Sequence, residues 1–318
     1  MSVGRSATGM RSSPWRNVPR IRLAMLCTIM VFGMVRQALA QESKARFEKL
    51  ESVIAGQMKL DDFRVDVRAN VFIEGGSNQN DEFRRTTRVL GRLVREDQWG
   101  KDGRRRVRSF TGDDYIFWEE DTIPFIVGMA IHRWPISNEP DIARVPSDPR
   151  LYGLACGITA VLISHESVKQ DMNVIQTKDR HNLSFSSEPR RVKGEWTNQH
   201  GARISVTLGE EPKPHVCRIE ASSNGYTASL DVAPQFPPEL AFGYPRKLVF
   251  KQLTPDGRLD ISEEAVVNLS LNQSLRSKTF QLAGLEIPRK NIVQMERGPQ
   301  PPQYWDGKQI REGYIETK

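Results

Sequence analysis

Apolar and polar residues alternate along FRVDVRANVFI, residues 63–73. A period of two places every second side chain on the same face of an extended chain, so this stretch predicts a β-strand with one face on a core and the other in water. The apolar face holds Phe63, Val65, Val67, Ala69, Val71 and Ile73. The polar face holds Arg64, Asp66, Arg68 and Asn70.

Directly before this strand, the period changes to that of a helix. Phe47, Leu50, Ile54 and Met58 recur at spacings of three and four, with charged residues between them. That spacing puts the four side chains on one stripe of an amphipathic helix. We therefore expect a helix that packs its apolar stripe on the protein and leads into the strand.

The two-residue period continues through a strongly basic stretch, residues 84–110, which contains ten Lys or Arg and three acidic residues. Thr87 and Val89 fall on one side, and Arg84 and Arg88 on the other. We expect the arginines on the solvated face of an antiparallel sheet, and the carboxylates available to pair with them across strands are Glu82, Asp97, Glu119 and Glu120. The alternative is an anionic partner of this face, such as a lipid headgroup or an acidic envelope polymer.

After Val168 the sequence predicts further strands in pairs, each pair joined by a tight turn. Asn224-Gly225 is a strong hairpin signal, because both residues tolerate the left-handed backbone that a two-residue turn requires. Pro255-Asp256-Gly257 gives a second turn of the same kind. The result is an antiparallel meander.

Two segments depart from this pattern. Residues 121–170 are apolar but broken by Pro and Gly, which predicts a helical insertion of buried helices and turns. Residues 274–318 are rich in Pro, Lys and Arg, and their RGPQPPQYWDGKQI segment is not expected to build a core. We predict a sheet domain over residues 41–273, including the insertion, and an extended C-terminal arm over 274–318.

The net charge of +7 is concentrated at the start of the chain. Residues 1–40 have six Arg and no acidic residue, an apolar run LAMLCTIMVFGMV, and Ala38-Leu39-Ala40 as a cleavage site, which is typical of a secretory signal peptide. Its removal leaves about +1, so nucleic-acid binding is not expected, and the mature protein is predicted to be periplasmic or secreted. An uncleaved N-terminal membrane anchor is the alternative, although the apolar run is shorter than the roughly 17–25 residues of a membrane span.

No metal, cofactor or catalytic site is predicted. The histidines lie outside metal-ligand spacings, and the sequence has no phosphate-binding loop or nucleophile elbow. A nucleophilic pair of Cys156 and His165 is the one conceivable catalytic arrangement, and its alternative is a buried Cys156 on an apolar helix. After export, Cys156 and Cys217 would remain as a disulfide or as two buried thiols. We therefore predict a non-catalytic protein without a cofactor.

The order of the elements resembles the LolA/LolB-like family of bacterial periplasmic lipoprotein carriers. The resemblance extends over about Glu42 to Leu271 and rests on the first helix, FRVDVRANVFIEG, the strands TRVLGRLVRED, RRRVRSF and YIFWEED, the apolar interlude and the later strands. It implies an α+β fold in which a strongly curved antiparallel sheet, an incomplete barrel, carries an N-terminal helix and a helical lid. This chain is longer than the carriers, with a large interlude and a C-terminal arm.

In that family the concave face of the sheet holds lipid acyl chains, so the resemblance implies an apolar ligand, a lipid or a lipidated protein. The wall of the site would consist of Phe63, Val65, Val67, Val71 and Ile73. The lid would come from Ile123, Phe125, Ile126, Leu151, Leu154 and Ile158, with Phe125, Leu151 and Leu154 as ligand contacts. The alternative is that these residues pack on one another as an ordinary core, in an envelope interaction protein whose Arg-rich face meets an anionic partner.

Overall fold

The structure is a computed structural model that describes residues 38–39, 41–51, 55–74, 80–120, 130–135, 146–154, 181–197, 201–287, 291–295 and 303–312. The predicted signal peptide lies outside the described residues except for Ala38 and Leu39, as do Phe125 and Cys156. Among the described helices, none combines the length and the apolar character that a membrane crossing requires.

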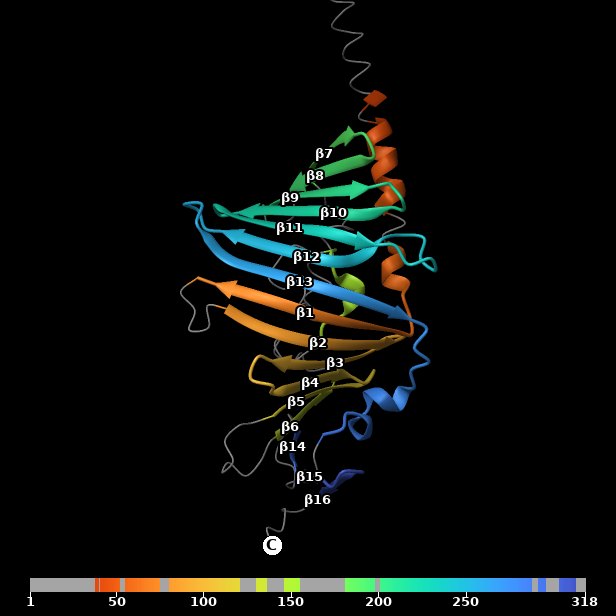
Figure 1. The fold of residues 1–318 in the computed structure, drawn as a ribbon, viewed down its shortest axis with the longest axis vertical. Helices are drawn as coiled ribbons and strands as arrows, with labels where there is room; N and C mark the ends of the chain where they lie inside the picture. The colour runs from red at the N-terminus through yellow and green to blue at the C-terminus, as the bar shows by residue number, and fades with distance from the viewer. Residues whose placement is uncertain are drawn as a thin grey trace, which may run out of the picture.

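Within the described residues, sixteen strands form one sheet, shown in Figure 1. The strands are β1 (Phe63–Ile73), β2 (Asn80–Leu90), β3 (Leu93–Gly100), β4 (Arg105–Phe110), β5 (Asp114–Glu119), β6 (Ala130–Pro135), β7 (His181–Glu188), β8 (Arg191–Thr197), β9 (Arg203–Gly209), β10 (His215–Ser223), β11 (Tyr226–Gln235), β12 (Tyr244–Leu253), β13 (Leu259–Leu271), β14 (Asn291–Met295), β15 (Gln303–Trp305) and β16 (Ile310–Glu312). A helix covers residues 41–51. Short 3-10 helices are η1 (Ala55–Lys59), η3 (Pro149–Leu151), η4 (Ser277–Phe280) and η5 (Leu282–Gly284).

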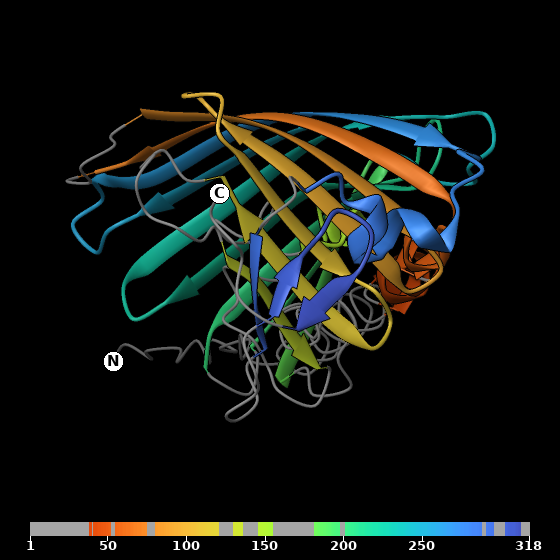
Figure 2. The ribbon, with the colours of Figure 1, turned by 90° about the horizontal axis from the view of Figure 1, so that it is seen from below.

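The strand order is β16-β15-β14-β6-β5-β4-β3-β2-β1-β13-β12-β11-β10-β9-β8-β7, so β16 and β7 are the two edges of the described sheet. Neighbouring strands are antiparallel except β6 and β14, which are parallel. Figure 2 shows the sheet bent into an arch, with η3 beneath it. The predicted strongly curved, incomplete antiparallel barrel with an N-terminal helix is confirmed.

Strand β1 joins the two halves of the arch, because it pairs with β2 on one side and with β13 on the other. Its predicted alternation is confirmed: Phe63, Val65 and Val67 are fully buried on the concave face. The intervening polar residues are half-buried or exposed on the convex face. β1 therefore has the two unlike faces that its sequence requires.

The chain covers both faces of the arch. On the concave face, helix 41–51 packs so closely on β8 that a Cβ atom at Gly194 would lie 2.8 Å from the ring of Phe47. On the convex face, the C-terminal segment, which we define as the described residues after 273 (274–287, 291–295 and 303–312), buries a second apolar cluster against β4–β6. This cluster contains Val107, Ile116, Trp118, Ile131, Leu285, Ile287 and Trp305.

Two expectations about the irregular segments were wrong. Residues 130–135, inside the predicted helical insertion, form strand β6, whose Ile131 alternates into the convex cluster. The C-terminal segment does build a core, because Trp305 is buried there and β14–β16 extend the sheet. Within the described part of the insertion, η3 is the helical element, and residues 121–129, 136–145 and 155–170 lie outside the described range.

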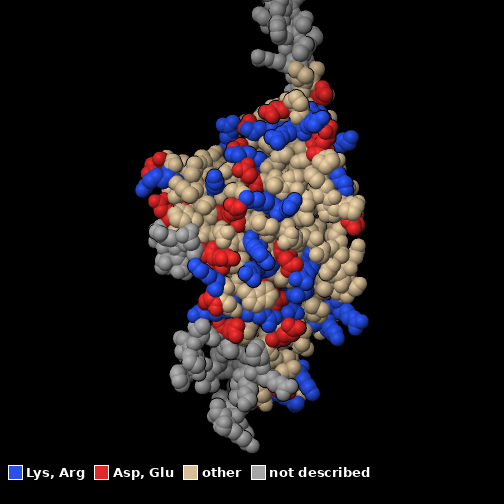
Figure 3. Space-filling model, in the orientation of Figure 1, with Lys and Arg blue, Asp and Glu red and all other residues tan. Residues whose placement is uncertain are grey.

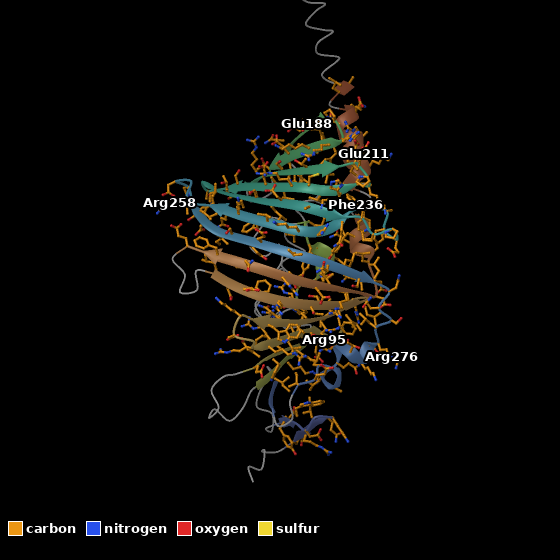
Figure 4. All side chains as sticks on the ribbon, in the orientation of Figure 1. Arg95, Glu188, Glu211, Phe236, Arg258 and Arg276 are labelled. Atoms are coloured by element: carbon orange, nitrogen blue, oxygen red, sulfur yellow. The ribbon has the colours of Figure 1, made fainter. Side chains whose placement is uncertain are left out.

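The arginines on the convex face pair with carboxylates. Figure 3 shows basic and acidic side chains intermingled on this face. Asp97 is buried and accepts hydrogen bonds from Arg88 at 2.7 Å, Arg95 at 2.8 Å and Arg105 at 2.6 Å. The same arginines reach the C-terminal segment: Arg95 donates to the carbonyl of Gly284 at 2.6 Å, and Arg105 to that of Leu285 at 2.9 Å. Figure 4 shows Arg95 beside this segment. Part of the basic stretch therefore fixes the C-terminal segment in place.

We expect Asp97→Asn to lower the free energy of unfolding by about 3–5 kcal/mol, because it leaves buried guanidinium groups without their counter-charge. The control is Glu119→Gln, which removes a partly exposed ion pair with Arg106 and is expected to change stability by about 0–1 kcal/mol. Urea unfolding measures both. Equal losses in the two variants would contradict the structural role of Asp97.

Candidate functional site

The concave face carries a largely apolar row of residues across seven strands. Cross-strand pairing aligns Val71 of β1 with Glu263 of β13, and Glu263 in turn with Phe250 of β12. The row continues over the remaining strands through Leu230, Ile219, Val206 and Gly194. We call this set the inner row. Its side chains are buried, and Glu263 is its one ionisable residue.

The predicted wall residues occupy the positions expected of a concave wall, but the protein itself covers them. Phe63, Val65, Val67 and Val71 are all buried in the main core. Ile73 lies at the end of β1, where it is 38% exposed and outside that core. Four of the five predicted wall residues therefore form one buried surface, and Ile73 lies outside it.

The described lid residues lie beneath the arch. Leu151 is the last residue of η3 and Leu154 follows it, both are buried, and Phe125 lies outside the described residues. Polar bonds hold the η3 segment, which we define as residues 146–154. The hydroxyl of Tyr244 donates to the carbonyl of Pro149 at 2.8 Å. The side-chain amide of Gln57 donates to the carbonyl of Tyr152 at 2.9 Å.

A buried polar cluster, which the sequence did not reveal, joins the η3 segment to the strands. Arg85 of β2 donates to the Ser147 hydroxyl at 2.8 Å and lies 3.6 Å from the carboxylate of Glu96 on β3. Glu96 also accepts from the backbone N–H of Ser147 at 3.0 Å and from Arg108 of β4. The Arg85 and Arg108 side chains therefore point inward, and the expectation that the basic stretch lies wholly on the solvated face was wrong for them.

A hollow of about 570 Å³ opens next to this cluster, at the ends of β2–β5. Its lining includes Phe83, whose ring centroid is 5.0 Å from the guanidinium carbon of Arg85, and Gln98, which accepts from Arg108 at 3.0 Å. Asp81, which pairs with Val71 of the inner row, lines it too. The hollow thus borders residues that contact the polar cluster and also borders Asp81, the cross-strand neighbour of Val71.

Two buried carboxyl groups on the concave face have opposite protonation behaviour. Burial alone would raise the pKa of Glu96, but Arg85, Arg108 and the bonds from Ser147 outweigh it and lower the pKa to about 2. Burial raises the pKa of Glu263 to about 8, against an opposing influence of the Arg85 charge. Glu263 is therefore mainly protonated at neutral pH, whereas Glu96 is ionised.

Catalytic and metal chemistry gains no support from the part of the chain that the structure describes. In that part, no three His, Cys, Asp or Glu side chains are grouped to bind a metal ion. Cys217 is a free, partly buried thiol on β10, and burial raises its pKa, which disfavours the reactive thiolate. The suggested pair of Cys156 and His165 lies outside the described residues.

Comparison with solved structures finds similar folds among bacterial proteins. A LolA superfamily protein from Nitrosomonas europaea matches at 14% identity and TM-score 0.41, over 76% of this chain and 97% of that one. A DUF1329 family protein from Desulfovibrio piger matches at 11% identity and TM-score 0.43, over 76% and 98%. A putative outer membrane lipoprotein-sorting protein domain from Vibrio parahaemolyticus matches at 10% identity and TM-score 0.41, over 74% and 97%.

The family that the sequence pattern resembles thus recurs among the similar structures. No family model and no curated protein sequence matches the chain. At these identities and TM-scores the likeness concerns the path of the chain alone.

We expect stability to fall as pH rises from 5 to 8, since the folded protein keeps a proton on Glu263 that the unfolded chain releases above its ordinary pKa of 4.5. The slope would approach about 1.4 kcal/mol per pH unit. Glu96 does not contribute in this window, because its stabilisation is lost only as pH falls below about 4.5 toward 2. Glu263→Gln should flatten the decline, as measured by thermal unfolding at several pH values.

The matched control is Glu264→Gln. Glu264 is the next residue on β13, but its side chain lies on the convex face and pairs with Lys247 at 2.5 Å. This variant should keep the decline of the unmodified protein. If Glu263→Gln declined equally steeply, the buried acid would not be the group that titrates.

Proposed function

We propose that this chain is an exported envelope protein that binds an apolar ligand, a lipid or a lipidated protein, on the concave face of its sheet, without catalysis. The observation that carries the proposal is the inner row, a surface across seven strands of an unclosed arch that is apolar except at Glu263. The described cover of the concave face includes helix 41–51, η1 and the η3 segment. None of these segments supplies one of the sixteen strands of the described sheet, so in this proposal a ligand displaces them while the strands stay paired.

Ligand binding would replace the apolar contacts of the η3 segment, and it would also break the polar bonds of that segment with Tyr244, Gln57 and Glu96. Leu151, Tyr152 and Leu154 now shield concave apolar surface, and an acyl chain would replace their contacts. Each buried methylene contributes roughly 0.8 kcal/mol, so one acyl chain supplies enough to compete with the η3 segment. In this proposal Phe63, Val65, Val67 and Val71 form the wall, and Leu151 and Leu154 belong to the cover.

A second candidate rests on the same burial. The wall residues are covered in the structure, which supports an envelope interaction protein with a self-filled core. The anionic partner proposed for its Arg-rich face is less well supported, because Arg88, Arg95 and Arg105 all bind Asp97. For either candidate, the location in the periplasm or outside the cell rests on the signal peptide predicted over residues 1–40.

Native mass spectrometry of the mature protein, purified from Gln41 onward without detergent, tests the first candidate. We expect co-purifying lipid, and we expect Val67→Asp to abolish it by placing a charge on the wall. Ala69→Phe is a second variant that fills the concave side without a buried charge, in case Val67→Asp does not fold.

Val266→Asp is the matched control. Val266 precedes the wall-facing Val267 on β13, but it is 44% exposed on the convex face. It should retain the lipid. A folded, lipid-free protein that takes up no lipid from vesicles would favour the self-filled core instead.

A further inference from the structure

Glu263 is out of place in its surroundings. Its neighbours across the strands are Val71 and Phe250, and Ala265 and Val267 follow it on the same face of β13. The side chain is 1% exposed, and among the residues that the structure describes neither carboxyl oxygen has a hydrogen-bond partner. Buried polar groups in native proteins are nearly always paired, because an unpaired group costs about 1–3 kcal/mol. A carboxyl left in this state on the concave wall points to a ligand group as its partner.

The protonation of this carboxyl decides which kind of partner fits. Near neutral pH it is mainly a neutral acid, since burial raises its pKa to about 8. A neutral carboxyl has one O–H to donate, so it suits an acceptor oxygen on the ligand.

The charges on the same concave face favour the same partner. Arg85 is close enough to oppose the rise in the pKa of Glu263, and it lies with Arg108 around Glu96. Val71 and Phe250, the cross-strand neighbours of Glu263, carry no charge. The next residue across the sheet from Val71 is Asp81 on β2. The guanidinium charge of Arg85 would repel an ammonium headgroup and attract an oxygen that carries negative charge.

The position of Glu263 also suits a headgroup. It lies near one end of the inner row, where Asp81 lines the hollow. From Glu263 the row continues through Phe250, Leu230 and Ile219, which offer only apolar surface to a chain. A ligand with its polar end at Glu263 would extend its chain over the arch.

We propose that Glu263 recognises the head of an acyl ligand, its carboxyl donating a hydrogen bond to the carboxylate or ester carbonyl oxygen at the end of the chain. The ligand class is thus a fatty acid or a fatty-acyl ester, not an alkylamine or a plain hydrocarbon. This inference rests on the proposed function, because it assigns the chemistry of the same concave site.

The test is displacement of the neutral fluorescent probe N-phenyl-1-naphthylamine from the full mature protein at pH 7. Palmitate, methyl palmitate and hexadecylamine have equal chain lengths, so their comparison isolates the head. We expect one or both acyl ligands to displace the probe at about tenfold lower concentration than hexadecylamine. Palmitate ahead of its ester would indicate a free fatty acid, and the reverse an esterified lipid.

Glu263→Leu completes the apolar row and should fold, yet it should lose the tenfold acyl preference while still binding the probe. Glu263→Gln keeps a donor and should keep the preference, which a merely structural role would not predict. Glu264→Leu, on the convex face, should behave as the unmodified protein. An acyl preference that survives Glu263→Leu, or no preference in the unmodified protein, overturns this inference alone. A protein that binds no probe at all overturns the proposed function and this inference with it.

Discussion

Two consecutive acidic residues on one strand organise both sides of this molecule. Glu96 and Asp97 of β3 point to opposite faces of the sheet, and both are almost fully buried. Glu96 binds Arg85, Arg108 and Ser147 on the concave face, and Asp97 binds arginines on the convex face. Because a buried carboxylate is tolerated only with such partners, the arrangement of the strands around β3 is fixed by charge pairing as well as by apolar packing.

The two clusters have different consequences. The outer one links the sheet to the C-terminal segment and so completes the second apolar cluster. The inner one links the sheet to the η3 segment, which shields the concave face. Packing of the wall against its cover therefore depends on polar contacts at one end of the arch, while the inner row farther along is almost wholly apolar.

The sequence predicted the elements that have one dry and one wet face. β1 followed its period of two, and the turns at Asn224-Gly225 and Pro255-Asp256-Gly257 lie between the strands expected. β3 was harder, because LVREDQWG is charged and yet covered on both faces, so its polarity suggested exposure that the fold does not provide. The C-terminal strands were missed for a related reason: Trp305 is buried only through contacts with residues far away in the sequence, and a Pro-rich flank gives no sign of them.

The sequence does contain a signal for the buried polar residues of the site, because they occupy the alternating positions that otherwise hold inward-facing apolar residues. Arg85 is two and four residues before Thr87 and Val89, so it falls on the face that β2 turns inward. Glu263 is likewise in phase with Ala265 and Val267. An ionisable residue at an apolar phase predicts burial, but the sequence does not identify the partners that meet it, because those come from other strands and from the η3 segment.

The pairing of β14 with β6 has a consequence for how the molecule is assembled. Residues 130–133 receive their neighbour from residues 292–295, near the far end of the chain. A polypeptide made from its amino end must therefore wait for almost its entire length before the outer sides of Ile116, Trp118 and Ile131 are sheltered. During that interval this half of the molecule exposes an apolar surface and an unpaired strand edge, and both features promote association with other chains.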